Sequence, residues 1–307
     1  MKRYVSKRII QCIIVLFGIT ILTFGCMFLT GDPTTLILGD TKGMSQEAIQ
    51  AFRVSRGFDK PWLVQYWNYI SGIFRGDFGI SYYYNRPCLE IVKDAFPNTV
   101  KLAFSALALT VIIAVPLGIL CAVKKNTVYD KIGMAFGLLG QSLPIFWVGM
   151  LLILLFGVQL KWLPVSGAGT WKHLIMPTVA LALFSCARNA RIVRSTMLDV
   201  MGQDYIRTAK AKGLGNSKVV FKHALRNALG PVITMLGIEL GSLLGGSIIT
   251  ESLFSWPGLG KLAITALERK DIPLVQCCVI LCASIFVLVN LVVDLLYVVI
   301  DPKAKLS

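Results

Sequence analysis

The chain has 307 residues, of which 55% are hydrophobic and only 15% are charged. Soluble domains usually carry about 25% charged and 45–50% apolar residues, so this composition excludes an ordinary soluble enzyme. Lysine and arginine number 31 against 16 aspartate and glutamate residues, which gives a net charge of +15. This excess would suggest a nucleic-acid partner unless the basic residues gather on one side of a bilayer, and the counts below place most of them there.

Six apolar runs are long enough to cross a membrane, which takes roughly 20 residues of helix. We predict spans at residues 9–29, 100–123, 133–160, 174–193, 229–250 and 274–300. The first run is too long for a signal peptide and no cleavage site follows it, which indicates an uncleaved helix. Arg188 and Arg191 make the fourth run the weakest.

Prolines mark several expected helix starts, where the missing N–H costs little. Those at or near starts are Pro97, Pro177, Pro231 and Pro273. Pro116 and Pro144 lie inside runs, so they predict a kink in the second span and a break in the third.

The basic residues predict the orientation of the spans. With the N-terminus in the cytoplasm, the inward segments hold 18 lysine and arginine residues and the short outward loops hold 5. The positive-inside rule therefore places both termini in the cytoplasm.

Residues 30–98 would then form a long outward loop in which seven basic residues balance seven acidic ones. Ser45 can cap a helix that ends at Arg56, with Gly57 as its stop. Trp62 follows a proline and opens a second amphipathic stretch. We expect a small subdomain on the outer face of the membrane, whose aromatic residues suit either an interfacial belt or a peptide-contacting surface.

The eight cysteines do not have the spacing of a disulfide framework. All but Cys88 lie inside apolar runs. We therefore expect them to be small buried hydrophobes.

The sequence contains short matches to catalytic motifs, but none of them lies in the structural setting that its chemistry requires. The Gly258-Leu259-Gly260-Lys261 stretch lies between two spans, whereas a dinucleotide fingerprint needs a strand before it. The two histidines, His173 and His223, fall near opposite membrane surfaces. We predict no catalytic residue, no metal site and no cofactor bound by this chain.

The loop between the fourth and fifth spans is basic and also has a helical pattern that ends at a glycine. Its candidate contact residues are Asp204, Tyr205, Arg207, Ala209, Ala211, Gly213, Leu214, His223, Leu225, Arg226 and Asn227. From the residues alone, a helix that docks on a partner and a solvated basic loop are equally good interpretations.

This loop resembles the Glu-Ala-Ala loop of the inner-membrane permeases of ATP-binding-cassette importers, in the dipeptide, oligopeptide and nickel branch. Arg207 and Thr208 depart from the Glu-Ala consensus of that loop. Further matching segments lie at residues 31–33, 76–81, 250–260 and 289–295.

The resemblance implies a second homologous permease, two ATPases that bind ATP and Mg, an extracytoplasmic substrate-binding protein and a bacterial inner membrane. It also implies a coupling helix at about residues 203–214, whose small residues would allow close approach to an ATPase.

The fifth span carries Gly237, Gly241 and Gly245 on one face, a spacing that lets two helices pack closely. Glu239, Ser242 and Gly246 fall on the opposite face and are our translocation-pathway candidates. A carboxylate within a span is costly unless it is paired or hydrated. Glu239 could therefore contact a cationic substrate group, or it could form a structural ion pair.

The segment after the fifth span is a candidate outer gate or binding-protein contact, through Glu251, Phe254, Trp256, Pro257 and Gly258. The alternative is a tight turn that only anchors the end of the span.

We thus predict an all-α polytopic membrane protein with six transmembrane helices, cytoplasmic termini, and the type I importer permease fold that the resemblance implies. Its divisions would be residues 1–29 (first helix), 30–98 (outer subdomain), 99–300 (permease core, with the coupling loop at 194–228) and 301–307 (cytoplasmic tail). The predicted function is import of di- or oligopeptides. Nickel or a metal chelate is the close alternative, and a secondary transporter or an intramembrane enzyme is disfavoured.

Overall fold

The computed structural model describes residues 2–29, 34 and 45–300, and apart from one isolated bridge all regular secondary structure in them is helical. This confirms the predicted all-α class. The predicted motif at 31–33 and the tail at 301–307 lie outside the described residues.

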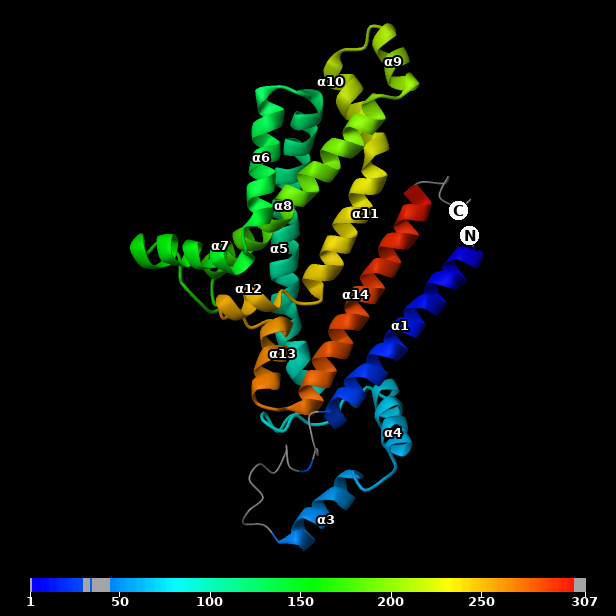
Figure 1. Cartoon of the computed structure of the whole chain (residues 1–307), viewed down its shortest axis with the longest axis vertical. Helices are drawn as coiled ribbons and strands as arrows, with labels where there is room; N and C mark the ends of the chain where they lie inside the picture. The colour runs from blue at the N-terminus through cyan, green and yellow to red at the C-terminus, as the bar shows by residue number, and fades with distance from the viewer. Residues whose placement is uncertain (1, 30–33, 35–44, 301–307) are drawn as a thin grey trace.

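Five long helices form an elongated bundle, with α9 and α10 at one end and α3 and α4 at the other (Figure 1). The long helices are α1 (Lys2–Leu29), α5 (Cys88–Val123), α8 (Trp171–Met201), α11 (Leu225–Leu244) and α14 (Ile272–Ile300). The shorter helices are α3 (Gln46–Arg56), α4 (Trp62–Phe74), α6 (Val128–Ser142), α7 (Ile145–Leu152), α9 (Asp204–Ala211), α10 (Asn216–Lys218), α12 (Ile248–Leu253) and α13 (Leu259–Glu268). Two π-helical segments, Ile153–Gln159 and Val219–Ala224, follow α7 and precede α11.

Four helices in the described part of the chain are long and apolar enough to cross a membrane: Val5–Met27, Cys88–Val123, Asn216–Leu244 and Ile272–Leu296. A fifth span is formed if α6 and Ile145–Gln159, which meet at 96°, count as one. The predicted break at Pro144 is therefore confirmed. Helix α8 is not among these spans, so the six-span count stays a prediction.

The predicted fifth span, residues 229–250, is wrong at its end. Helix α11 stops at Leu244, and α12 begins afresh at Ile248. Gly246 between them has φ +101°, a conformation that residues with a Cβ rarely adopt, and its backbone lies against Gly260. The chain can turn sharply only because glycine stands there.

Three of the prolines expected at helix starts lie further inside. Pro97, Pro177 and Pro231 are internal to α5, α8 and α11, whereas Pro273 is the second residue of α14. Each of these three helices also includes residues that precede its apolar run. Helix starts predicted from the apolar runs alone therefore lie too late in the chain.

The two helices predicted between Ser45 and residue 74 are present as α3 and α4. The Ser45 hydroxyl accepts the N–H of Ala48 at 3.2 Å, and Gly57 ends α3 with φ 71°. Helix α4 contacts α1, where the hydroxyls of Tyr66 and Thr20 are 3.0 Å apart. These contacts fix α4 against the first helix.

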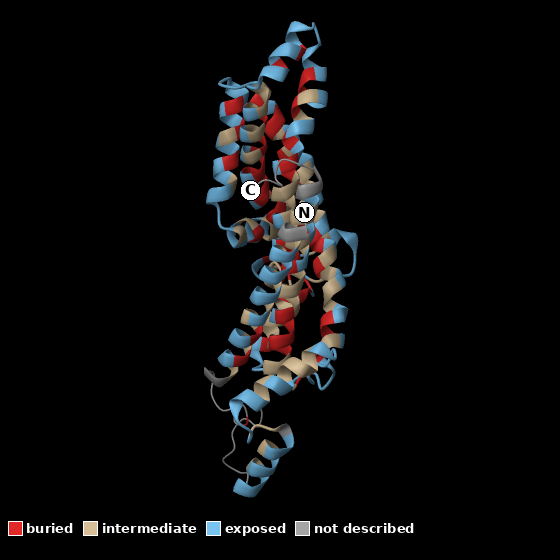
Figure 2. Cartoon of the chain, turned by 90° about the vertical axis from the view of Figure 1, so that its right-hand side faces the viewer, coloured by how far each residue is buried: buried red, intermediate tan, exposed pale blue. Residues whose placement is uncertain are grey.

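The buried residues concentrate where the long helices meet (Figure 2). The predicted glycine stripe packs against α14: an added Cβ at Gly237 would lie 2.1 Å from Val293, and one at Gly241 would lie 3.4 Å from Phe286. Gly245 ends α11 and has only its own helix nearby. Five of the cysteines are buried as expected, Cys12 and Cys282 are half-buried and Cys26 is exposed, and no disulfide joins any of the eight.

Candidate functional site

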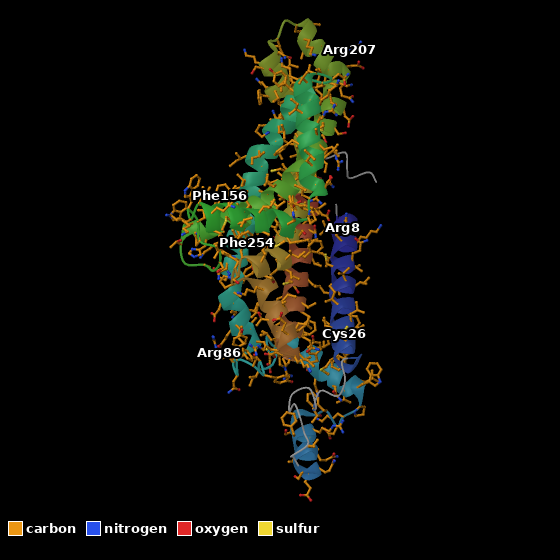
Figure 3. The ribbon with its side chains drawn as sticks, turned by 60° about the vertical axis from the view of Figure 1, so that its left-hand side comes forward. Arg8, Cys26, Arg86, Phe156, Arg207 and Phe254 are labelled. Atoms are coloured by element: carbon orange, nitrogen blue, oxygen red, sulfur yellow. The ribbon has the colours of Figure 1, made fainter. Side chains whose placement is uncertain are left out.

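Helix α9 is held at its end of the bundle by its apolar face. Ile206 and Ala209 are buried in a cluster with Ile119 of α5, Met197 of α8 and Val219. These two residues are three apart and therefore lie on one side of the helix. The opposite side is left exposed, with Arg207 near the tip of the molecule (Figure 3).

Most of the predicted loop contacts are on this exposed side, but Ala209 is not. Asp204, Tyr205, Ala211 and Leu214 are exposed. Ala209 is 7% exposed and contacts the chain's own core, which corrects the expectation that it meets an ATPase. Ala209 is small, but it lies on the same side of α9 as Ile206, and this apolar side points inward.

Gly213 terminates the α9 segment in the conformation that the sequence suggested. Its φ is +78°, its N–H reaches the Lys210 carbonyl at 2.9 Å, and an added Cβ would meet nothing within 4 Å. The requirement for glycine is therefore one of backbone conformation and not of space.

The second half of the loop returns to the bundle through Val219–Ala224. His223 and Leu225 are half-buried, while Arg226 and Asn227 are exposed. The Asn227 side chain donates to the His223 carbonyl at 2.7 Å. Val220 and Ala224 belong to the same core cluster as Ile206 and Ala209 of α9, so both arms of the loop pack on one apolar core.

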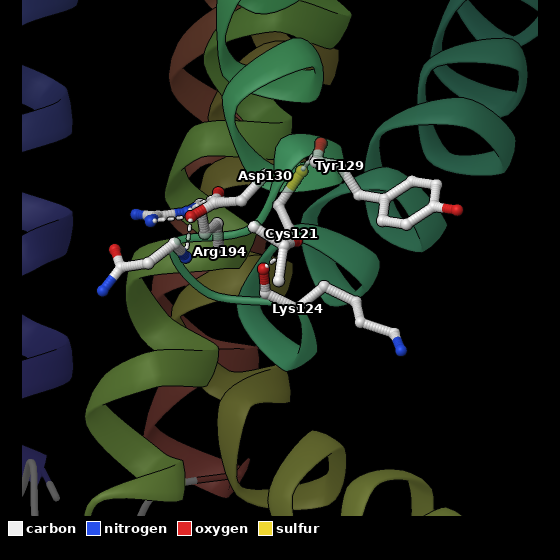
Figure 4. Close-up of polar contacts among 7 residues, drawn as sticks. Cys121, Lys124, Tyr129, Asp130 and Arg194 are labelled. Carbon is white, nitrogen blue, oxygen red and sulfur yellow. Dashed lines mark hydrogen bonds and ion pairs between the residues drawn. The ribbon is translucent and has the colours of Figure 1, made fainter.

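An ion pair that the sequence analysis did not identify lies next to this apolar core. Arg194 of α8 donates to both carboxylate oxygens of Asp130 on α6, at 2.6 and 2.7 Å (Figure 4). Asp130 also accepts the N–H of Asn126 at 2.9 Å. The pair ties the turn between α5 and α6 to α8.

The pathway candidate Glu239 is buried between α11 and α8. Its carboxylate accepts hydrogen bonds from the Ser185 hydroxyl and from the Arg188 guanidinium, both on α8. Arg188 itself is partly exposed, with 45% of its side chain accessible against 7% for Glu239. Ser242 is exposed one turn on, and Gly246 forms the turn after α11.

Helix α12 and the segment after it contact α5 at Asn98 and Thr99. Thr99 of α5 donates to Glu251 at 3.1 Å and accepts the N–H of Leu259 at 2.8 Å. The Trp256 indole donates to the Asn98 carbonyl at 2.9 Å. Burial raises the pKa of the Glu251 carboxyl, while the N–H of Lys261 and the Thr99 hydroxyl act the other way.

Of the five residues expected at an outer gate, only Pro257 is exposed. Phe254 packs on Met176 and Ala180 of α8 and lies near Phe156 (Figure 3). An added Cβ at Gly258 would lie 2.5 Å from the Glu251 carboxylate, so this glycine is needed for close approach.

Asp271, which the sequence analysis also missed, joins the turn before α14 to the segment before α5. Its buried carboxylate accepts the Ser81 hydroxyl and the N–H groups of Tyr82 and Tyr83, at 3.1 and 3.2 Å for the two amides. No group of three or more histidine, cysteine or acidic side chains in the described residues could hold a metal ion.

Two family models match the chain. "Binding-protein-dependent transport system inner membrane component" matches residues 114–306, and the corresponding N-terminal model matches residues 1–103. Together they match all of the chain except residues 104–113 and 307.

Curated relatives match over the whole length. The glutathione transport system permease protein GsiC of Escherichia coli strain K12 is 42% identical over 306 residues, 99% of each chain. The GsiC protein of Shigella flexneri serotype 5b is 41% identical over the same span.

Solved structures share the fold. An inward-facing structure of the MetNI methionine ABC transporter superposes with a TM-score of 0.60 at 17% identity, covering 69% of this chain and 96% of that one. An amino acid ABC transporter gives 0.51 at 17% identity, covering 70% and 94%.

The chain is thus a non-catalytic permease subunit of an ABC importer in the bacterial inner membrane, and ATP is bound and hydrolysed on separate ATPase subunits. A substrate-binding protein delivers what it transports. The chain belongs to the family of binding-protein-dependent transport system inner membrane components.

Proposed function

We propose that this permease imports small peptides. The observation that carries the proposal is the 42% identity, over 99% of both chains, to a permease named for glutathione transport. Glutathione is itself a tripeptide, which agrees with the di- and oligopeptide class inferred from the sequence. The importer would hold this chain, a second homologous permease, two ATPases and one extracytoplasmic binding protein.

In this assembly α9 is the coupling helix. Its apolar side is fixed to the ends of α5 and α8, so a displacement of α9 would move both helices together. Its exposed side carries Asp204, Tyr205 and Arg207, which are available to an ATPase. Arg226 and Asn227 would flank that contact on the returning arm.

The topology that fits this role has six spans, with α9 and both termini in the cytoplasm and α3 and α4 outside. The division into first helix, outer subdomain, permease core and tail follows from it. Helix α8 would cross the membrane although it carries Arg188, Arg191 and Arg194, because each of these has a side-chain partner on a neighbouring helix.

The segment from Glu251 to Gly258 is proposed to anchor the outer end of α11. Its burial and its bonds to Asn98 and Thr99 support an anchor, and the exposed Pro257 is the point left for a binding-protein contact. The face of α11 with Ser242, beside the Glu239 pair, is proposed to border the pathway.

Uptake by cells with and without the gene tests the substrate class. Labelled glutathione, a dipeptide, a pentapeptide and nickel would be compared, each with ATP depletion as a control. Loss of peptide or glutathione uptake on deletion is the expected result. Loss of nickel uptake alone would move the protein to the metal class, and unchanged uptake of all four would contradict the proposal.

A further inference from the structure

The groove between α8 and α11 contains a charged side chain that the coupling and anchoring contacts do not use. It has a volume of about 480 Å³ and is lined by Arg188, Ile192, Pro231, Thr234, Met235 and Ile238. Within this lining, all of which the structure describes, Arg188 is the only charged residue. The Thr234 hydroxyl already donates to its own helix, at the Gly230 carbonyl 3.2 Å away.

The two members of the Arg188–Glu239 pair differ in what they offer to a ligand. Both carboxylate oxygens of Glu239 accept a hydrogen bond from α8, one from Ser185 and one from Arg188, and the side chain is only 7% exposed. Glu239 is therefore poorly placed to receive a cationic group from the groove. A carboxylate that contacts a passing substrate would need to be exposed and to have an oxygen free to accept a hydrogen bond.

Arg188 retains donors. A guanidinium has five N–H groups in a planar fork, and within the described structure one terminal nitrogen of Arg188 contacts Glu239 while no other protein acceptor is seen. Its side chain is 45% exposed on the groove. Glu239 holds the guanidinium in place, and a fixed fork of this kind matches a carboxylate through two parallel hydrogen bonds.

We propose that Arg188 is a specificity-determining residue that binds a carboxylate of the transported peptide as it passes along the groove. The inference rests on the proposed function, because small peptides carry the carboxylate that it needs. Glu239 is then a positioning residue, which orients the guanidinium and offsets its charge. The walls of the groove beside Arg188 are apolar and come from Ile192, Met235 and Ile238, so they offer a passing carboxylate no competing charged group.

The test compares uptake of a labelled tripeptide with uptake of its C-terminal amide, in the assembled transporter. The main variant is the double change Arg188→Gln with Glu239→Gln, which leaves no unpaired buried charge. Arg191→Gln is the matched control, since Arg191 lies on the same helix but donates to Gln141 of α6 at 3.1 Å and does not line the groove. Copurification of the ATPases reports on assembly.

Loss of a charge-assisted contact corresponds to roughly a 10- to 100-fold decrease. We expect that decrease for the free acid in the double variant, with the acid-to-amide ratio unchanged in Arg191→Gln. A loss of equal size for acid and amide would overturn the inference, because it indicates a structural role only. Absence of wild-type uptake of either peptide would contradict the proposed function and the inference with it.

Arg188→Lys covers the case in which the double variant does not assemble. Lysine keeps the charge beside Glu239 but lacks the planar fork. A reduced acid-to-amide ratio supports the inference, and a wild-type ratio contradicts it.

Discussion

Asp130 and Arg194 join the first turn of α6 to α8 by two hydrogen bonds, 2.6 and 2.7 Å long, and Arg194 directly follows Val193 of the core that supports α9. The carboxylate is 5% exposed and the guanidinium 23%. The turn that connects α5 to α6 is thereby tied to the same helix that leads into the coupling loop. In the proposed coupling, a displacement of α9 would therefore reach α5, α6 and α8 together.

Asp130→Asn should destabilise the permease substantially. Removing one partner of a buried pair costs about 3–5 kcal/mol, and the cost here should fall at the lower end because Arg194 keeps some exposure. The measurement is thermal unfolding of the purified assembly in detergent.

The half-buried pair of Arg8 and Asp294, 3.3 Å apart with 41% and 26% of the two side chains exposed, provides the comparison for Asp130→Asn. Its loss should destabilise the assembly less, because both of its side chains are more exposed than those of the Asp130–Arg194 pair. Equal destabilisation by Asp130→Asn and Asp294→Asn would contradict the prediction that the Asp130–Arg194 pair stabilises the permease more strongly.

Gly213→Val should impair transport while leaving insertion intact. A residue with a Cβ at φ +78° costs roughly 1–2 kcal/mol, so the end of α9 would change shape. Gly215 is the control: it also has open space around it, but its φ of −60° suits any residue. Uptake assays should show reduced transport in Gly213→Val only. Equal uptake by both variants would contradict the prediction that transport needs glycine at position 213.

Local signals explain which parts of this fold could be predicted. Helix α3 was found from Ser45 and Gly57, and the break before α7 from Pro144, because caps and prolines act on the backbone nearby. The turn at Gly246 was missed, since the apolar run continues through it and only its contact with Gly260 requires it.

Tertiary pairing explains what could not be predicted. Asp130 and Arg194 are 64 residues apart, and Asp271 and Ser81 are 190 apart, so no spacing in the sequence connects them. For Glu239 the sequence indicated a costly carboxylate but left its partner open. Only the packing of α8 on α11 places Ser185 and Arg188 beside it.

Asp271→Ala should loosen the outer end of the bundle. The change leaves the Ser81 hydroxyl and the N–H groups of Tyr82 and Tyr83 without their acceptor, and each unsatisfied buried group costs about 1–3 kcal/mol. Limited proteolysis should then cut near residues 79–88 more quickly. Glu268→Ala, an exposed position three residues earlier, should leave the cleavage rate unchanged. Identical proteolysis of both variants would argue against the role of Asp271.

A cysteine at Ser217, exposed in the coupling loop, should react with a membrane-impermeant maleimide only from the cytoplasmic side. Ser55→Cys, on the exposed part of α3, should react only from the outside. Both are compared with a parent that carries Cys26→Ser, because Cys26 is exposed in this chain. The opposite labelling pattern would invert the proposed topology.

The most direct measurement is accumulation of labelled glutathione or tripeptide in liposomes that contain the complete transporter and its binding protein. ATP is supplied on the side that exposes the ATPases, with an ionophore to collapse any proton gradient. For an ABC importer we expect accumulation that requires ATP hydrolysis, persists with the ionophore and is impaired in Gly213→Val. Accumulation that persists without ATP and disappears with the ionophore would contradict it.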